Sequence, residues 1–203
     1  MINLTEHKAT KFKNKMDGFT SINVSVKRNG FCQQMQKQDG VICKHCYAKR
    51  VYPNMEKRYS ENIDWFLSDD FRPEPINRSI VRIHSFGELY NEKHFENLIA
   101  LFLYNPNTTF TMWTKRKDIV EKVFAKTKKP SNLILIYSSP VLNTTAKLPE
   151  GFDKVFTVFA PDQKVEINCM KSCKDCMKCY TKNNIAFINE ELKLPQNNFK
   201  KKA

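Results

Sequence analysis

The chain has 203 residues, of which 34 are Lys or Arg and 21 are Asp or Glu, so its formal net charge is +13. This length suits one domain of ordinary size, and a hydrophobic content of 41% excludes a disordered chain. No apolar run approaches the roughly 18 residues of a membrane helix, and the polar N-terminal stretch lacks the apolar core of a secretion signal. We therefore expect a cytoplasmic protein with no membrane partner.

Short apolar strands alternate with amphipathic helices along the chain. Strands are predicted over 22–26, 79–84, 108–113, 132–137 and 154–159, and helices over 55–68, 92–104 and 116–126. Such alternation is typical of parallel β–α–β units, and five or six strands are too few for a closed eight-stranded barrel. The prediction is an α/β fold, with a partial barrel of mostly parallel strands over residues 1–160; a doubly wound sheet is the alternative. A cysteine-rich, metal-binding segment with a basic tail follows over 161–203.

Polar residues stand where the predicted strands end. The second strand is followed by Ser85-Phe86-Gly87-Glu88, the third by Thr114-Lys115 and the fourth by Ser138-Ser139. Ligands of parallel α/β folds bind at the carboxyl ends of the strands. Lys115 would suit a carboxylate or phosphate there and Ser138 a ribose, although ordinary helix-start and turn chemistry explains both residues as well.

The first of two cysteine groups lies in the loop after the first strand. Cys32, Cys43 and Cys46 follow the spacing C-x10-C-x2-C. Thiolates select zinc, copper(I) or iron–sulfur clusters, and a C-x2-C turn lets two sulfurs approach one metal centre. Three ligands suit a cubane cluster with one free iron, whereas structural zinc needs four, and His45 or His84 would then supply the fourth.

The second group holds the other four of the seven cysteines, Cys169, Cys173, Cys176 and Cys179, spaced C-x3-C-x2-C-x2-C. Ferredoxin-type cluster motifs use similar steps, whereas structural zinc sites usually separate two C-x2-C pairs by a longer spacer. We therefore favour a [4Fe–4S] cluster over zinc in both groups. A division in which Cys179 completes the first site remains open.

These motifs together resemble the radical S-adenosylmethionine (SAM) superfamily, and more closely a group of phage-encoded gene-product proteins. The resemblance rests on the three-cysteine loop ending in Cys46-Tyr47-Ala48, on Gly87-Glu88 after the second strand, on Thr114-Lys115 after the third, and on Cys169–Cys179. It covers residues from about 20 to 180. The sequence departs from the superfamily in its longer first cysteine spacing and in a single rather than double glycine.

The resemblance implies an enzyme in which Cys32, Cys43 and Cys46 hold a [4Fe–4S] cluster whose open iron is chelated by SAM. Tyr47 would then lie by the adenine, and Gly87 and Glu88 would meet the SAM amino group. Ser85, Lys115 and Ser138 complete the predicted cofactor-binding set, and the substrate is not readable from the sequence.

The competing hypothesis is a non-catalytic module. In this hypothesis, clusters or zinc ions stabilise the fold of a small basic protein that binds nucleic acid or has a regulatory role. The basic residues permit nucleic acid as a partner without establishing it. If the gene is phage-encoded, the expected location is the host cytoplasm.

Overall fold

The computed structural model describes residues 9–11, 14–50, 53–169 and 172–193. One sheet runs through the molecule with its strands in chain order: β1 (Ala9–Lys11), β2 (Thr20–Ile22), β3 (Ile80–Ile83), β4 (Thr109–Thr114), β5 (Leu133–Ser138), β6 (Lys154–Phe159) and β7 (Phe187–Glu191). β1 is antiparallel to β2, and every later neighbour pair is parallel. The predicted α/β class with a mostly parallel sheet is confirmed.

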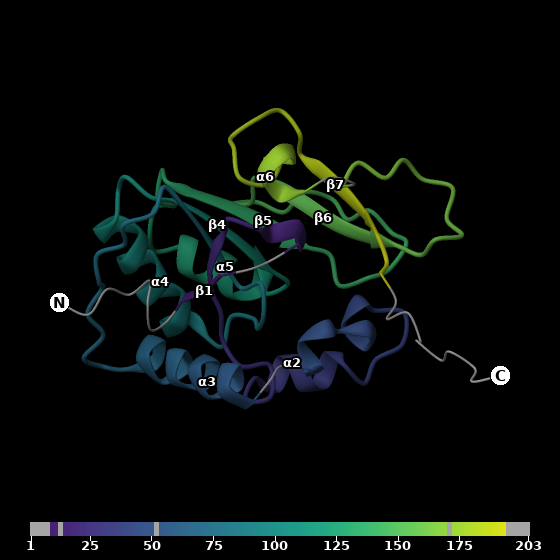
Figure 1. The fold of residues 1–203 in the computed structure, drawn as a ribbon. Helices are drawn as coiled ribbons and strands as arrows, with labels where there is room; N and C mark the ends of the chain where they lie inside the picture. Colours follow the sequence, from purple (N-terminus) through teal and green to yellow (C-terminus); the bar gives the residue numbers. More distant parts are fainter. Residues whose placement is uncertain (1–8, 12–13, 51–52, 170–171, 194–203) are drawn as a thin grey trace.

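Helices connect these strands (Figure 1). They are the 3₁₀ turns η1 (Asn14–Met16), η2 (Ile42–His45) and η3 (Tyr47–Arg50), and the α-helices α2 (Gly30–Met35), α3 (Pro53–Leu67), α4 (Glu92–Tyr104), α5 (Lys117–Phe124) and α6 (Cys173–Cys176). A doubly wound sheet reverses its strand order at a switch point. Here the order never reverses, so the doubly wound alternative is wrong.

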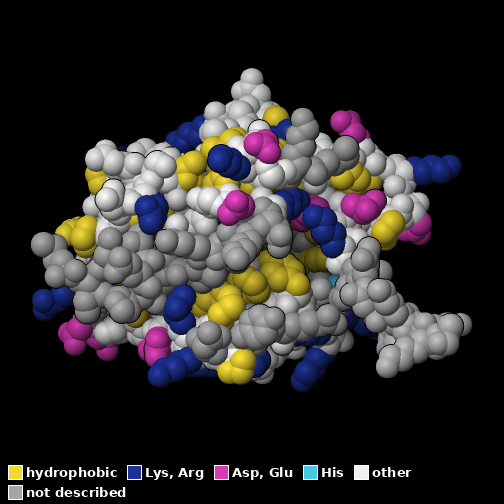
Figure 2. All heavy atoms as spheres, viewed as in Figure 1, with side chains coloured by type: hydrophobic (Ala, Val, Ile, Leu, Met, Phe, Trp, Pro, Cys, Tyr) yellow, Lys and Arg dark blue, Asp and Glu magenta, His cyan; other side chains and the backbone are white. Residues whose placement is uncertain are grey.

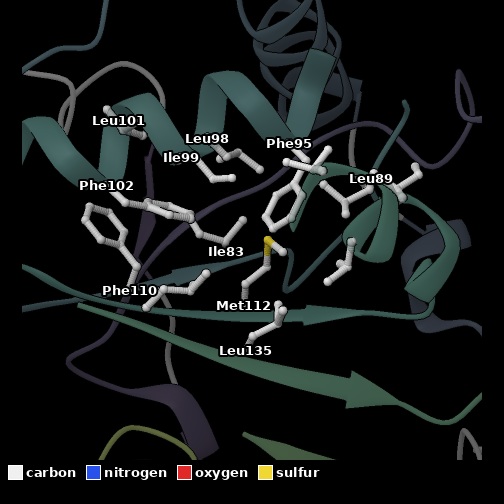
Figure 3. Close-up of a cluster of buried hydrophobic side chains, with 14 of the residues drawn as sticks. Ile83, Leu89, Phe95, Leu98, Ile99, Leu101, Phe102, Phe110, Met112 and Leu135 are labelled. Atoms are coloured by element: carbon white, nitrogen blue, oxygen red, sulfur yellow. The ribbon is translucent and has the colours of Figure 1, made fainter. Parts of the chain in front are cut away.

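The central strands β4 and β5 are buried on both faces, and successive residues of each pack into two different cores. In β4, Phe110 and Met112 pack toward the helices, whereas Trp113 packs on the opposite face. Figure 3 shows Phe95, Leu98 and Phe102 of α4 pointing toward the strands beneath them. Helices α3 and α5 add Ile63, Phe66, Ile119, Val120 and Val123 to the same core.

The opposite face of the sheet is covered by the C-terminal cysteine segment. Cys179 and Tyr180 are buried there against Phe19, Trp113 and Ile188. Figure 1 shows α6 on the side of the sheet away from α3. The cysteine segment is therefore part of the core, and the predicted boundary at residue 160 falls between the paired strands β6 and β7.

The first predicted strand is displaced. Pairing ends at Ile22, although residues 23–26 remain buried. Beyond Ile22 the Val24 amide donates to the Phe86 carbonyl (3.2 Å) and the Ser25 amide to the Tyr59 carbonyl (3.2 Å). The apolar alternation over 22–26 therefore reflects the burial of residues 23–26 between the end of β3 and α3, and not continued strand pairing.

No helix among the described residues is both long enough and apolar enough to cross a membrane. On the face seen in Figure 2, Lys and Arg side chains are scattered among acidic ones.

Candidate functional site

The first cysteine is fixed by a helix cap. Asn29 caps α2 by accepting a hydrogen bond from the Cys32 amide (3.1 Å). Its side-chain nitrogen donates to the carbonyls of Glu88 (3.1 Å) and Leu89 (3.3 Å), and Asn29 is buried. Asn29 therefore ties Cys32 to the chain that follows β3. Sequence reasoning missed it, although an Asn before a short helix is the usual cap signal.

The other two cysteines of the loop are held at the end of β5. The Ile42 amide donates to the Pro140 carbonyl (2.8 Å), and the Leu142 amide donates to the Gly40 carbonyl (3.0 Å). The Cys46 amide then donates to the Cys43 carbonyl (3.1 Å), which closes the C-x2-C turn. This pairing with the chain after β5 brings a long loop to the carboxyl edge of the sheet.

The three thiols share one environment. Burial raises the pKa of Cys32, and the neighbouring Glu88 and Cys43 raise it further, whereas Lys115 lowers it. Burial also raises the pKa of Cys43. Lys115 lowers this pKa, and the neighbouring Cys46 raises it. Cys32, Cys43 and Cys46 are thus close enough to interact, and Lys115 is the cation beside Cys32 and Cys43. Burial keeps the Cys32 and Cys43 thiols protonated, and a metal centre bound to them would displace those protons.

Glu88 is buried and holds two strand ends together. One carboxylate oxygen accepts from the Leu89 amide (2.8 Å) and from the Thr114 hydroxyl, and the other accepts from the Lys115 amide (2.8 Å). Burial raises the pKa of the Glu88 carboxyl group, whereas Lys115 and the hydrogen bonds lower it. These donors take three of the roughly four acceptor positions that a carboxylate offers.

The remaining predicted residues lie around this edge. The Lys115 ammonium donates to the Ser138 hydroxyl (3.1 Å), which joins the ends of β4 and β5. The Ser85 hydroxyl accepts from Ser21 (3.0 Å), and the Ser85 carbonyl accepts from the Tyr47 hydroxyl (2.5 Å). The Tyr47 residue is nevertheless 64% exposed, and its ring packs edge-on against Phe86 (5.3 Å between centroids).

Gly87 has a backbone that only glycine tolerates well. Its φ is +91°, and a Cβ atom there would lie 2.3 Å from the Val24 carbonyl oxygen. The resemblance implies that Gly87 meets the SAM amino group, but on the side where a Cβ would stand the space is already filled by Val24.

The second cysteine group gathers on the opposite face of the sheet from α3–α5. The Cys169 amide donates to the Asn189 carbonyl of β7 (3.0 Å), and Ser172 caps the short helix that carries Cys173 and Cys176. Burial, followed by interaction with Cys169, Cys173 and Cys176, raises the pKa of Cys179 to about 12. The structure therefore groups Cys179 with the other three C-terminal cysteines.

A lysine from η1 contacts this second group. The Lys15 ammonium donates to the Cys169 sulfur (3.1 Å) and to the Glu190 carboxylate. Burial opposes its charge, but these two partners outweigh burial and raise the pKa of Lys15. Because 154 residues separate Lys15 from Cys169, no local pattern in the sequence points to this contact.

Arg82 lies on the same face as the second group. Its guanidinium stacks 3.9 Å over the Trp113 ring and donates to the Met16 sulfur (3.2 Å). It also interacts with the Tyr180 hydroxyl and with Cys179. Arg82 is therefore surrounded by aromatic rings and sulfur atoms.

His84 does not join the cysteines. Its φ is +60°, and its ring packs edge-on against His94 (5.3 Å between centroids), whose ring stacks on Phe66 at 5.0 Å. Both ring nitrogens of His84 and Nε2 of His94 are buried without a partner among the described residues. His45 is exposed in η2. The structure thus places His84 in the helix-side core.

The buried histidine pair predicts loss of stability in acid. Burial lowers the pKa of His94 to about 3, and burial with His94 as neighbour lowers the pKa of His84 well below its usual value. Below about pH 6.5 the unfolded chain takes up protons that the folded chain does not. The free energy of unfolding should therefore fall, by up to about 1.4 kcal/mol per pH unit for each histidine.

Denaturant unfolding between about pH 7 and pH 5 measures this slope. Replacing His94 by Gln should reduce it, whereas replacing the exposed His45 by Gln should leave it unchanged. Equal slopes in all three proteins would contradict the assignment.

By donor type alone, the two cysteine groups suit iron–sulfur chemistry. All seven cysteines are free thiols, three of them between β2 and β3 and four between β6 and β7. Soft thiolate sets of this size suit clusters, and a set of three leaves one iron free. Within the described ranges, no group of three or more His, Cys, Asp or Glu side chains is arranged to hold a metal ion.

The chain was compared with protein families, curated proteins and solved structures. A family model described as "Gene product 88" matches residues 3–197. No curated protein and no solved structure matches.

Proposed function

The chain belongs to the gene product 88 family, and we propose that it is an iron–sulfur enzyme of radical SAM type. In this proposal Cys32, Cys43 and Cys46 hold a [4Fe–4S] cluster with an open iron. Cys169, Cys173, Cys176 and Cys179 hold a second [4Fe–4S] cluster. SAM and a substrate of unknown class are its partners, in the cytoplasm of the cell or, for a phage gene, of the host.

One observation carries this proposal. The loop that bears three thiols is anchored at the carboxyl edge of a parallel sheet, beside residues from the ends of three successive strands. Ligands of parallel α/β folds bind at this edge. The strand order supports a partial barrel as the finer description of the fold, because strands of such barrels follow chain order.

The chain's own residues have distinct roles in the proposal. The exposed ring of Tyr47 would stack on the adenine, and the remaining acceptor position of Glu88 would receive the SAM amino group. Lys115 and Ser138 would meet the substrate or the ribose. Ser85 and Gly87 shape the turn that holds Glu88 in place.

A bound cluster that received one electron would cleave the bound SAM to methionine and a 5′-deoxyadenosyl radical. The protein supplies position and a shielded surface for that chemistry. The second cluster would relay electrons or bind substrate.

The test begins with metal and colour. Protein purified without oxygen should be brown, absorb broadly near about 400 nm and hold about eight irons per chain. Colourless protein with stoichiometric zinc would overturn the proposal in favour of a zinc-stapled module.

The enzymatic prediction is release of 5′-deoxyadenosine. Dithionite-reduced protein incubated with SAM should form 5′-deoxyadenosine. The assay needs only SAM and a reductant, so it can be run without the natural substrate. Glu88→Gln should weaken SAM binding, whereas the exposed Glu96→Gln on α4 serves as a matched control. A loaded protein that neither binds nor cleaves SAM would leave the non-catalytic alternative, a metal-stapled nucleic-acid-binding or regulatory protein.

A further inference from the structure

The contact between Lys15 and the second cysteine group carries an inference that rests on the proposed function. Lys15 reaches Cys169 from η1, whereas the cysteine is held beside β7, so two ends of the described chain meet here. Glu190 of β7 shares the same ammonium group. The three side chains form a set that we call the Lys15 triad: Lys15, Cys169 and Glu190.

The triad has the chemistry of an outer shell around a metal centre. Lys15 places a positive charge and an N–H donor 3.1 Å from the Cys169 sulfur. Hydrogen bonds to cluster sulfurs and nearby charges set the reduction potential of iron–sulfur centres. The Lys15 and Glu190 side chains are only 27% and 23% exposed, so solvent screens these charges less than it would at the surface.

We infer that Lys15 is a positioning residue that raises the reduction potential of the C-terminal cluster, and that Glu190 opposes it. Reduction adds one electron, and therefore one negative charge, to the cluster. A cation beside a ligand sulfur stabilises that reduced form, and a carboxylate beside it destabilises the same form. Removing Lys15 and removing the charge of Glu190 should therefore have opposite effects.

The variants follow from this opposition. Lys15→Met should shift the midpoint potential of the C-terminal cluster to more negative values, and Lys15→Arg should retain most of the parent potential. Glu190→Gln keeps an acceptor for Lys15 but loses the negative charge, so the shift should be positive. Lys193→Met is the matched control, because Lys193 also approaches Glu190 (3.8 Å) but is 71% exposed and has no contact with Cys169 among the described residues.

The measurement is a dithionite titration of full-length protein followed by electron paramagnetic resonance. The background carries alanine at Cys32, Cys43 and Cys46, so that only the C-terminal cluster responds. Opposite shifts for Lys15→Met and Glu190→Gln, with none for Lys193→Met, support the inference. If Lys15→Met does not load iron, the positive shift of Glu190→Gln decides it, because a purely structural role for the triad predicts no such shift.

The two possible failures are distinguishable. Loaded variants that all share the parent potential overturn the inference and leave the proposed function intact. A parent protein that holds no iron overturns the proposed function together with the inference.

Discussion

Replacing Cys43 by alanine is expected to halve the bound iron, from about eight to about four atoms per chain, while the absorption of the remaining cluster persists. Cys43 lies with Cys32 and Cys46, and the four C-terminal cysteines interact with one another on a different part of the sheet. Loss of one ligand from a three-thiol set leaves too few to hold a cluster. We expect SAM-dependent spectral changes to disappear with it.

The reciprocal variant is the matched control. Cys176→Ala should also remove about half of the iron but should leave the response to SAM in place, because Cys176 belongs to the four-member group. Iron and sulfide analysis, with resonance spectra recorded before and after SAM addition, separates the two. Loss of both clusters from the Cys43 variant would contradict the division into three and four.

Replacing Gly87 by alanine is expected to lower the free energy of unfolding by about 3 kcal/mol or more. Two costs combine at this position. The φ of +91° is strained for any residue with a Cβ, and that Cβ would lie 2.3 Å from the Val24 carbonyl oxygen and 2.4 Å from the Val24 side chain. Relief would require the end of β3 to move away from residue 24, and Glu88 would move with it.

Gly18 separates strain from crowding. Its φ is +82°, but a Cβ there would have no atom within 4 Å. Gly18→Ala should therefore cost only the backbone strain, about 1 to 2 kcal/mol. Denaturant unfolding of the two variants gives the comparison, and equal losses would show that contact with Val24 is not what requires glycine at position 87.

Much of the fold follows from periodicity in the sequence. The predicted strand at 154–159 and helix at 92–104 match β6 and α4 residue for residue. Apolar runs of this length are long enough for their period to be clear. By contrast, β7 was missed because Phe187–Glu191 is short and ends in two acidic residues. This segment is a strand because it pairs with β6, and its own composition does not indicate one.

The cysteine spacing alone indicated two groups, because Cys43 and Cys46 are three residues apart and the four C-terminal cysteines follow one another at three or four residues. Cys32 stands eleven residues before Cys43, so the fold has to bring it to the other two. Only the tertiary structure decided how distant residues complete each group. Asn29 ties Cys32 to Glu88, and Lys15 meets Cys169, across 154 residues in the second case. Such contacts depend on loop closure and sheet pairing, which leave no local pattern in the sequence.

The sequence gives the net charge of the protein, but the fold decides where the charged groups lie. The sequence by itself determined that the protein is basic, with +13 overall, and that its seven cysteines stand in two separate stretches of the chain. The structure decided that Cys179 lies with the other three C-terminal cysteines. Only the fold decided that Lys115 lies beside Cys43 in the first group and Lys15 beside Cys169 in the second. The physical reason is that a parallel sheet brings strand ends and the covering segment together, whatever their separation along the chain.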